Sequence, residues 1–147
     1  MDDAYLARVR DEFGLALPAQ CVAFMRAFPS ELRTTKLDLS WCQEPISERY
    51  FLESSDQVFE LNQRVRTPGV PWLEDDGPWP NRFFVIGDDQ CGNYYAIDTD
   101  AENAAVYFYD HETGRIDQEA DGLRAYADKR IQETLDFNEK HAKHRAL

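Results

Sequence analysis

Acidic side chains dominate the residues of this chain that could take part in chemistry. Of 147 residues, 28 are Asp or Glu and 16 are Lys or Arg, so the formal net charge is −12. Among so many carboxylates some pair will always lie at the separation that a glycosidase needs, so their abundance is no specific sign of acid–base catalysis. A small hydrolase that uses paired carboxylates stays open as an alternative.

Histidines and cysteines form no pattern typical of a catalytic or metal site. His111 lies between Asp110 and Glu112, but no second pair of ligands accompanies it. The three cysteines are widely spaced and form no CxxC pair, which favours unbridged thiols in a reducing compartment. No phosphate-binding loop or calcium loop is present. The sequence therefore predicts no metal and no cofactor, and it favours a protein that is not an enzyme.

The negative charge is concentrated in one part of the chain. Residues 67–121 contain 13 acids and two bases, for a net charge of −11, whereas residues 1–66 carry −3 and residues 122–147 carry +2. A surface of this kind repels phosphate backbones and anionic membranes, so it predicts no nucleic-acid partner and no membrane partner. It would attract a basic protein. The alternative is that acidic turns serve solubility alone.

Two further features of the sequence bear on where in the cell the protein is found. The chain has no run of 18 apolar residues, and its first residues, Met1-Asp2-Asp3, lack the basic and apolar regions of a secretory signal. Together with the thiols, these features predict a cytoplasmic protein.

Two tryptophans flank an acidic run in a proline-rich loop. Trp72 and Trp79 stand on either side of Glu74, Asp75 and Asp76. Large aromatic residues anchor protein interfaces, and acids add selectivity and association rate. This arrangement predicts a partner-binding segment, in which amides in place of the three acids would slow association. The alternative is that either ring folds down and fixes the loop to the core.

The turns between predicted strands carry further acids. Asp88 and Asp89 follow the run of residues 82–86, Asp110 ends the run of residues 104–110, and Glu112 lies in the turn after it. We include these four residues in the predicted partner-binding surface.

The hydrophobic periodicity predicts the helices and strands that position these side chains. Apolar residues recur at helical spacing in residues 2–13, in the segment after Leu17-Pro18, in residues 54–65 and in the stripe of a long C-terminal helix that includes Leu123, Ala127 and Leu135. The alternation of Leu37, Leu39 and Trp41 with polar residues predicts a half-buried strand with Trp41 in the core. Residues 50–52 are predicted to form another, short strand. Residues 82–86, 93–98, 104–110 and 115–116 are strand-like runs joined by short turns.

Strands so closely spaced must form an antiparallel meander. The sequence therefore predicts an α+β fold in a single domain over residues 1–147, with N-terminal helices and a long C-terminal helix packed on the sheet.

The strand and turn residues resemble the SUKH superfamily, which includes the yeast Smi/Knr cell-wall regulators and many bacterial immunity proteins. The resemblance rests on Phe83-Phe84-Val85-Ile86-Gly87-Asp88, then Cys91-Gly92-Asn93-Tyr94-Tyr95-Ala96-Ile97-Asp98, then Val106-Tyr107-Phe108-Tyr109-Asp110-His111-Glu112. Leu17-Pro18 is similar to the family's N-terminal helix start. Phe28-Pro29-Ser30-Glu31 departs from the family's glycine turn after the second helix, and Asn93 stands where an acid is common.

The resemblance implies a protein-binding domain without catalytic residues. It implies an immunity protein that neutralises a cognate polymorphic toxin, a basic and nuclease-like domain, by stoichiometric binding. A regulatory scaffold of the Smi/Knr kind, which binds host proteins, is the alternative.

Overall fold

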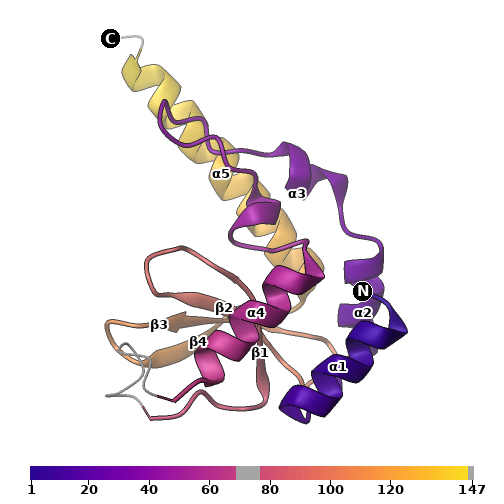
Figure 1. The fold of residues 1–147 in the computed structure, drawn as a ribbon. Coiled ribbons are helices and arrows are strands. Elements are labelled where there is room, and N and C mark those ends of the chain that lie inside the picture. The colour runs from indigo at the N-terminus through magenta and orange to yellow at the C-terminus, as the bar shows by residue number, and fades with distance from the viewer. Residues whose placement is uncertain (69–76, 146–147) are drawn as a thin grey trace.

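The computed structural model describes residues 1–68 and 77–145 of the chain. Helices come first in the chain order, four strands follow, and one long helix comes last (Figure 1). The elements are α1 (Asp3–Phe13), α2 (Ala19–Arg26), α3 (Ser30–Thr34), η1 (Ile46–Glu48), α4 (Ser55–Arg66), β1 (Phe83–Asp88), β2 (Tyr94–Asp98), β3 (Val106–Asp110), β4 (Arg115–Ala120) and α5 (Leu123–Arg145).

The four strands form one antiparallel meander in the order β1-β2-β3-β4. Aromatic and β-branched residues dominate β1 to β3 and suit a pleated, buried surface, and the connections between strands are short. The α+β class and the antiparallel meander are therefore as the sequence predicts.

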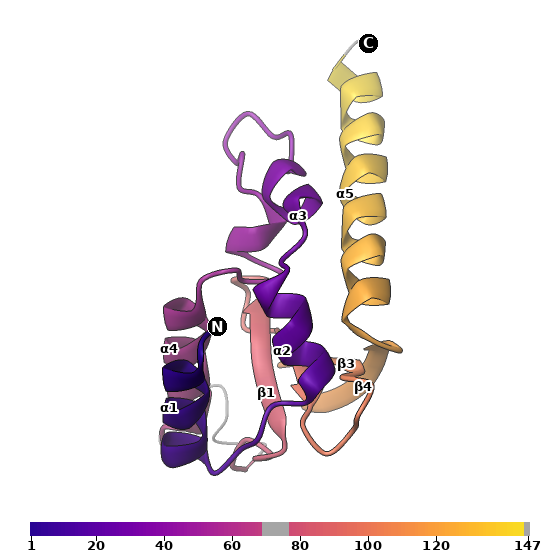
Figure 2. The same ribbon diagram turned by 90° about the vertical axis from the view of Figure 1, so that its right-hand side faces the viewer.

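Helices cover both faces of this sheet. Figure 2 shows α1 and α4 on one side of β1, and α2 and α5 on the other. On the first face, Asn62 of α4 bonds to Val85 of β1. On the second, the ring of Tyr126 of α5 lies 5.3 Å from that of Tyr95 of β2. The N-terminal part of α5 packs on the sheet, while its C-terminal part extends beyond it (Figure 1).

An irregular segment, not a strand, borders the free side of β1. Leu52 N donates to Ile86 O at 2.9 Å, and Asp88 N donates to Arg49 O at 3.1 Å. The predicted strand at residues 50–52 is thus wrong as a regular element, although its backbone does pair with β1.

Trp41 contradicts the prediction that it is a core residue. Residues 36–45 form a loop with two isolated bridges, Lys36 with Pro45 and Leu39 with Cys42, and the Trp41 side chain is 79% exposed. The alternation is real, but none of the strands in the described residues pairs with this segment, so the tryptophan packs on no sheet face there. Leu135 of α5 is also exposed, although it falls on the predicted apolar stripe and its neighbour Thr134 is buried.

Among the helices of the described ranges, none combines the length and the apolar character that crossing a bilayer requires.

Candidate partner-binding site

Two acidic turns lie side by side at one end of the sheet. They connect β1 to β2 and β3 to β4, and we call residues 88–94 and 110–114 together the turn pair. Asn93 joins them, because its Oδ1 accepts from His111 N at 3.0 Å and lies 2.7 Å from His111 Nδ1. Gly92 adopts a φ of +98°, and a Cβ there would lie 3.2 Å from the His111 ring. Glycine at this position thus permits both the left-handed backbone and the close approach of the two turns.

Asp89 and Asp110 shape the turns on which they lie. Asp89 Oδ1 accepts from Cys91 N at 2.8 Å and from Asn93 N at 3.2 Å. Asp110 accepts from Glu112 N at 2.9 Å and from the Thr113 hydroxyl at 3.0 Å, and these bonds to its carboxylate lower its pKa. Both residues therefore hold negative charge in a fixed place, and both are also part of the turn architecture.

Asp88 differs from these two acids because it lines a cavity. Its carboxyl is half-buried, and burial raises its pKa above the ordinary value of 3.8. The cavity has a volume of about 460 Å³. The described residues that line it are Arg64, Asp88, Gln90, Cys91, Gly92, Tyr94 and His111.

This cavity offers poor support for the paired-carboxylate hydrolase. Among its described lining residues Asp88 is the only carboxylate, whereas acid–base hydrolysis of that kind needs two. In residues 1–68 and 77–145, no three His, Cys, Asp or Glu side chains gather in a way that could hold a metal ion.

The nine predicted binding residues have three different outcomes. Asp88, Asp89, Asp110 and Glu112 come together at the turn pair, and Glu112 is exposed there. Trp79 is 6% exposed, and its Nε1 donates to Phe83 O at 2.8 Å. Trp72, Glu74, Asp75 and Asp76 lie outside the described residues.

Trp79 therefore takes the alternative role of a core residue, not that of a surface anchor. Its ring meets those of Tyr94 and Tyr109 edge-on, at 5.8 and 5.4 Å, directly under the turn pair. An indole buried with its N–H satisfied gains more from this packing than it could from exposure.

Sequence reasoning missed two cations at this end of the molecule. Arg64 lines the cavity, and Arg49 Nη2 donates to Asp89 O at 3.1 Å. Neither residue lies in the acidic stretch, so counting charge along the chain could not place them here. They offset part of the local charge, yet the four acids of the turn pair outnumber them.

Replacing Asp88 by Asn is expected to stabilise the fold at neutral pH. A carboxyl whose pKa is raised on folding favours the native state below its unfolded pKa, and this contribution is lost as the pH rises through the folded pKa. Urea denaturation from about pH 4 to pH 7 should show less loss of stability with rising pH in Asp88→Asn than in the wild type. Asp100→Asn, an exposed acid at the opposite end of the sheet, is the control and should change little. Equal slopes in wild type and Asp88→Asn would show that burial of Asp88 has no such effect.

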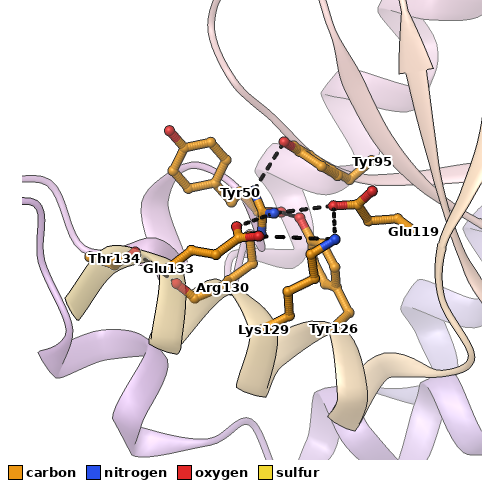
Figure 3. A network of polar contacts seen from close by, with 8 residues as sticks. All are labelled: Tyr50, Tyr95, Glu119, Tyr126, Lys129, Arg130, Glu133 and Thr134. Atoms are coloured by element: carbon orange, nitrogen blue, oxygen red, sulfur yellow. Dashed lines mark hydrogen bonds and ion pairs between the residues drawn. The ribbon is translucent and has the colours of Figure 1, made fainter. Parts of the chain in front are cut away.

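A second polar cluster lies between α5 and the sheet (Figure 3). The guanidinium carbon of Arg130 is 5.4 to 5.6 Å from the ring centres of Tyr50, Tyr95 and Tyr126. Its Nη2 lies 3.1 Å from Glu119 of β4 and also pairs with Glu133.

Most of this cluster is closed to solvent. The Arg130 side chain is 13% exposed, and the fully buried Tyr126 donates its hydroxyl to Tyr50 O at 2.8 Å. We assign to the Arg130 cluster the role of fixing α5 on the sheet, so it is not part of the candidate site.

The structure thus combines a four-stranded meander flanked by helices with two acidic turns joined by hydrogen bonds at one end of the sheet. The chain belongs to the SMI1 / KNR4 family (SUKH-1), whose family model matches residues 1–129. SUKH proteins are commonly immunity proteins, and as a family they are generally non-enzymatic immunity or regulatory proteins. Comparison with curated proteins and with solved structures found no match.

Proposed function

We propose that this protein is an immunity protein that neutralises a cognate basic, nuclease-like toxin domain by stoichiometric binding. The turn pair is its main electrostatic contact, and the toxin's basic cleft is the complementary surface. The observation that carries the proposal is the meeting of Asp88, Asp89, Asp110 and Glu112 at one end of the sheet. A regulatory scaffold for host proteins is the competing function, since the family includes both kinds of protein.

Preorganisation supports the use of these acids in binding. Internal hydrogen bonds hold Asp89 and Asp110 in place, so little side-chain entropy is lost when a cation approaches. Residues 77–121 contain ten acids and two bases, which extends the negative field beyond the turn pair. Such fields speed association with a basic partner and fade with added salt.

The first experiment is affinity capture with the products of neighbouring genes, followed by calorimetry on each bound protein. A tight one-to-one complex with a basic domain, together with loss of that domain's nuclease activity, supports the immunity function. Several weak partners whose binding depends little on charge would instead favour the scaffold.

The double substitution Asp88→Asn/Glu112→Gln is expected to slow association with that partner by about three- to tenfold at low salt. Glu112 accepts none of the backbone hydrogen bonds that define the β3–β4 turn, and an amide oxygen at position 88 can keep the bond that Asp88 accepts from the Gln90 backbone, so the fold should remain intact. Stopped-flow fluorescence at about 0.02 M and about 0.5 M salt measures the effect, which should largely vanish at the higher concentration.

The matched control is Asp100→Asn/Glu102→Gln, which removes the same charge from the β2–β3 turn at the other end of the sheet. It should change the association rate less than twofold. If both double variants slowed binding equally, net charge alone would explain the steering and the turn pair would lose its assigned role.

A further inference from the structure

The most exposed large apolar side chain in the described part of the protein lies outside the turn pair, although Glu44 of the same loop bonds to Gln90 of that pair. Trp41 is 79% exposed, and the only other large hydrophobic residue of comparable exposure among the described residues is Leu135 at 50%. Trp41 stands at the tip of the 36–45 loop. Leu39 and Cys42 close that tip by donating to each other's carbonyl oxygens, at 3.1 and 3.2 Å.

This loop is fixed to the protruding part of α5. Asn138 Nδ2 donates to Lys36 O at 2.8 Å, and Asn138 Oδ1 accepts from Asp38 N at 2.8 Å. Gln43 Nε2 also donates to Leu39 O at 2.9 Å, which braces the turn from within. Figure 2 shows the loop beside the upper part of α5. Trp41 is thus presented to solvent on a loop that two hydrogen bonds join to α5 and a third braces from within.

The loop and α5 enclose an aromatic cleft. Its volume is about 330 Å³, and it is lined by Leu39, Ser40, Trp41, Phe137 and His141. Phe137 and His141, one turn apart on α5, stack with ring centres 4.0 Å apart and an interplanar angle of 25°. Three rings on two hydrogen-bonded segments therefore border one small space, which suits a flat group that stacks.

Charge selects the kind of group. The two segments that form the cleft, residues 36–45 and 134–141, carry four acids and two bases, within a chain of net charge −12. A second copy of this chain would bring equal negative charge and be repelled. A guanidinium combines planarity with positive charge, and its weak hydration lets it stack on aromatic faces, tryptophan above all.

The same protein already uses this chemistry internally. In the Arg130 cluster a guanidinium lies among three tyrosine rings with carboxylates beside it (Figure 3). We infer that the cleft of Trp41, Phe137 and His141 is a second binding site, which receives an arginine side chain of a protein partner. The partner's basic nature rests on the proposed function, whereas the selectivity of the cleft for a guanidinium does not.

The test uses small probes and needs no knowledge of the partner. Acetyl-glycyl-arginyl-glycine amide is titrated into the ¹⁵N-labelled full chain at fixed pH and low salt. The probe should shift the indole N–H signal of Trp41, identified by its loss in Trp41→Leu. The same peptide with citrulline, which is planar but uncharged, should bind about two- to fivefold more weakly.

Phe137→Leu should weaken binding of the arginine peptide, while Asp88→Asn/Glu112→Gln should leave the Trp41 shift unchanged. Equal binding of the citrulline peptide, or no shift of the Trp41 signal, would overturn the inference. These outcomes are independent of whether a basic partner is captured, so failure of this site and failure of the immunity function can be told apart.

Discussion

Gly87→Ala is expected to destabilise the fold by about 3 kcal/mol, because β1 has no room for a side chain at this position. A Cβ on Gly87 would overlap the carbonyl group of Tyr50 and lie 2.7 Å from Arg49 O. Both are backbone atoms, which cannot rotate aside as the end of a flexible side chain could. The strand and the 49–52 segment must separate, which breaks the bonds from Leu52 N to Ile86 O and from Asp88 N to Arg49 O.

Urea denaturation measures this loss, and Gly14→Ala is the matched control. Gly14 ends α1 with a φ of +70°, and a Cβ added there would meet no atom within 4 Å, so alanine costs only the left-handed strain, about 1 to 2 kcal/mol. A loss for Gly87→Ala no larger than for Gly14→Ala would show that the two segments can move apart freely.

This prediction also bears on the candidate site. Arg49, whose carbonyl meets Gly87, sends its guanidinium to Asp89 O in the turn pair. A displaced 49–52 segment would therefore disturb one of the acidic turns as well as the sheet.

The meander could be predicted because its physics is local. Aromatic and β-branched runs with short polar turns allow no connection other than a hairpin, and β1 to β4 follow in sequence order. Residues 37–41 show the same alternation, yet they form only isolated bridges. A pattern of alternation indicates which side chains share a face, but whether a second strand covers that face depends on distant chain.

The candidate site was predictable only in part, for a similar reason. The acids of the two turns are evident in the sequence, and their meeting follows from the topology of a meander. An aspartate followed by Gly92 and Asn93 is typical of a turn in which the carboxylate accepts backbone hydrogen bonds. The part that Asp89 plays in closing its turn could therefore have been inferred from the sequence. The position of Arg64 and the buried place of Trp79 depend on packing between elements, which no local pattern encodes.

The Trp41 cleft lay beyond sequence reasoning altogether. Its walls come from residues 39–41 and from Phe137 and His141, almost one hundred positions later in the chain. Asn138, which joins the two segments, looks like any polar residue on an exposed helix.

Asn62→Ala is expected to cost about 4 kcal/mol, the largest loss among the substitutions considered. Asn62 is fully buried on α4, on the face that packs against the sheet. Its Nδ2 donates to Val85 O at 2.8 Å, and its Oδ1 accepts from Val85 N at 2.9 Å. The side-chain amide thus satisfies both backbone groups of one residue in β1.

Alanine would leave the N–H and C=O groups of Val85 buried without partners, and each such group costs about 1 to 3 kcal/mol. It would also remove one of the two acceptors of Arg66 Nη1, Asn62 Oδ1 at 2.7 Å, and leave only Asn62 O at 3.2 Å, at a position where burial lowers the Arg66 pKa to about 10. Asn62→Asp keeps the acceptor for Val85 N and for Arg66, but its second oxygen would face Val58 O and Val85 O, to which Asn62 Nδ2 donates, so this variant should be destabilised as well.

Urea denaturation gives the free energies, and hydrogen exchange at the Val85 amide reports the bond directly. Asn103→Ala is the control, because Asn103 is exposed and donates one bond, to Asp121 O at 2.9 Å; it should cost less than about 1 kcal/mol. Suppose that Asn62→Ala lost no more unfolding free energy than Asn103→Ala and that the Val85 amide stayed protected from hydrogen exchange. A water molecule would then have to replace the side-chain amide of Asn62, and the prediction would be wrong. The join between α4 and β1 would then rest on the apolar residues around Asn62, chiefly Val58, Leu61 and Val65.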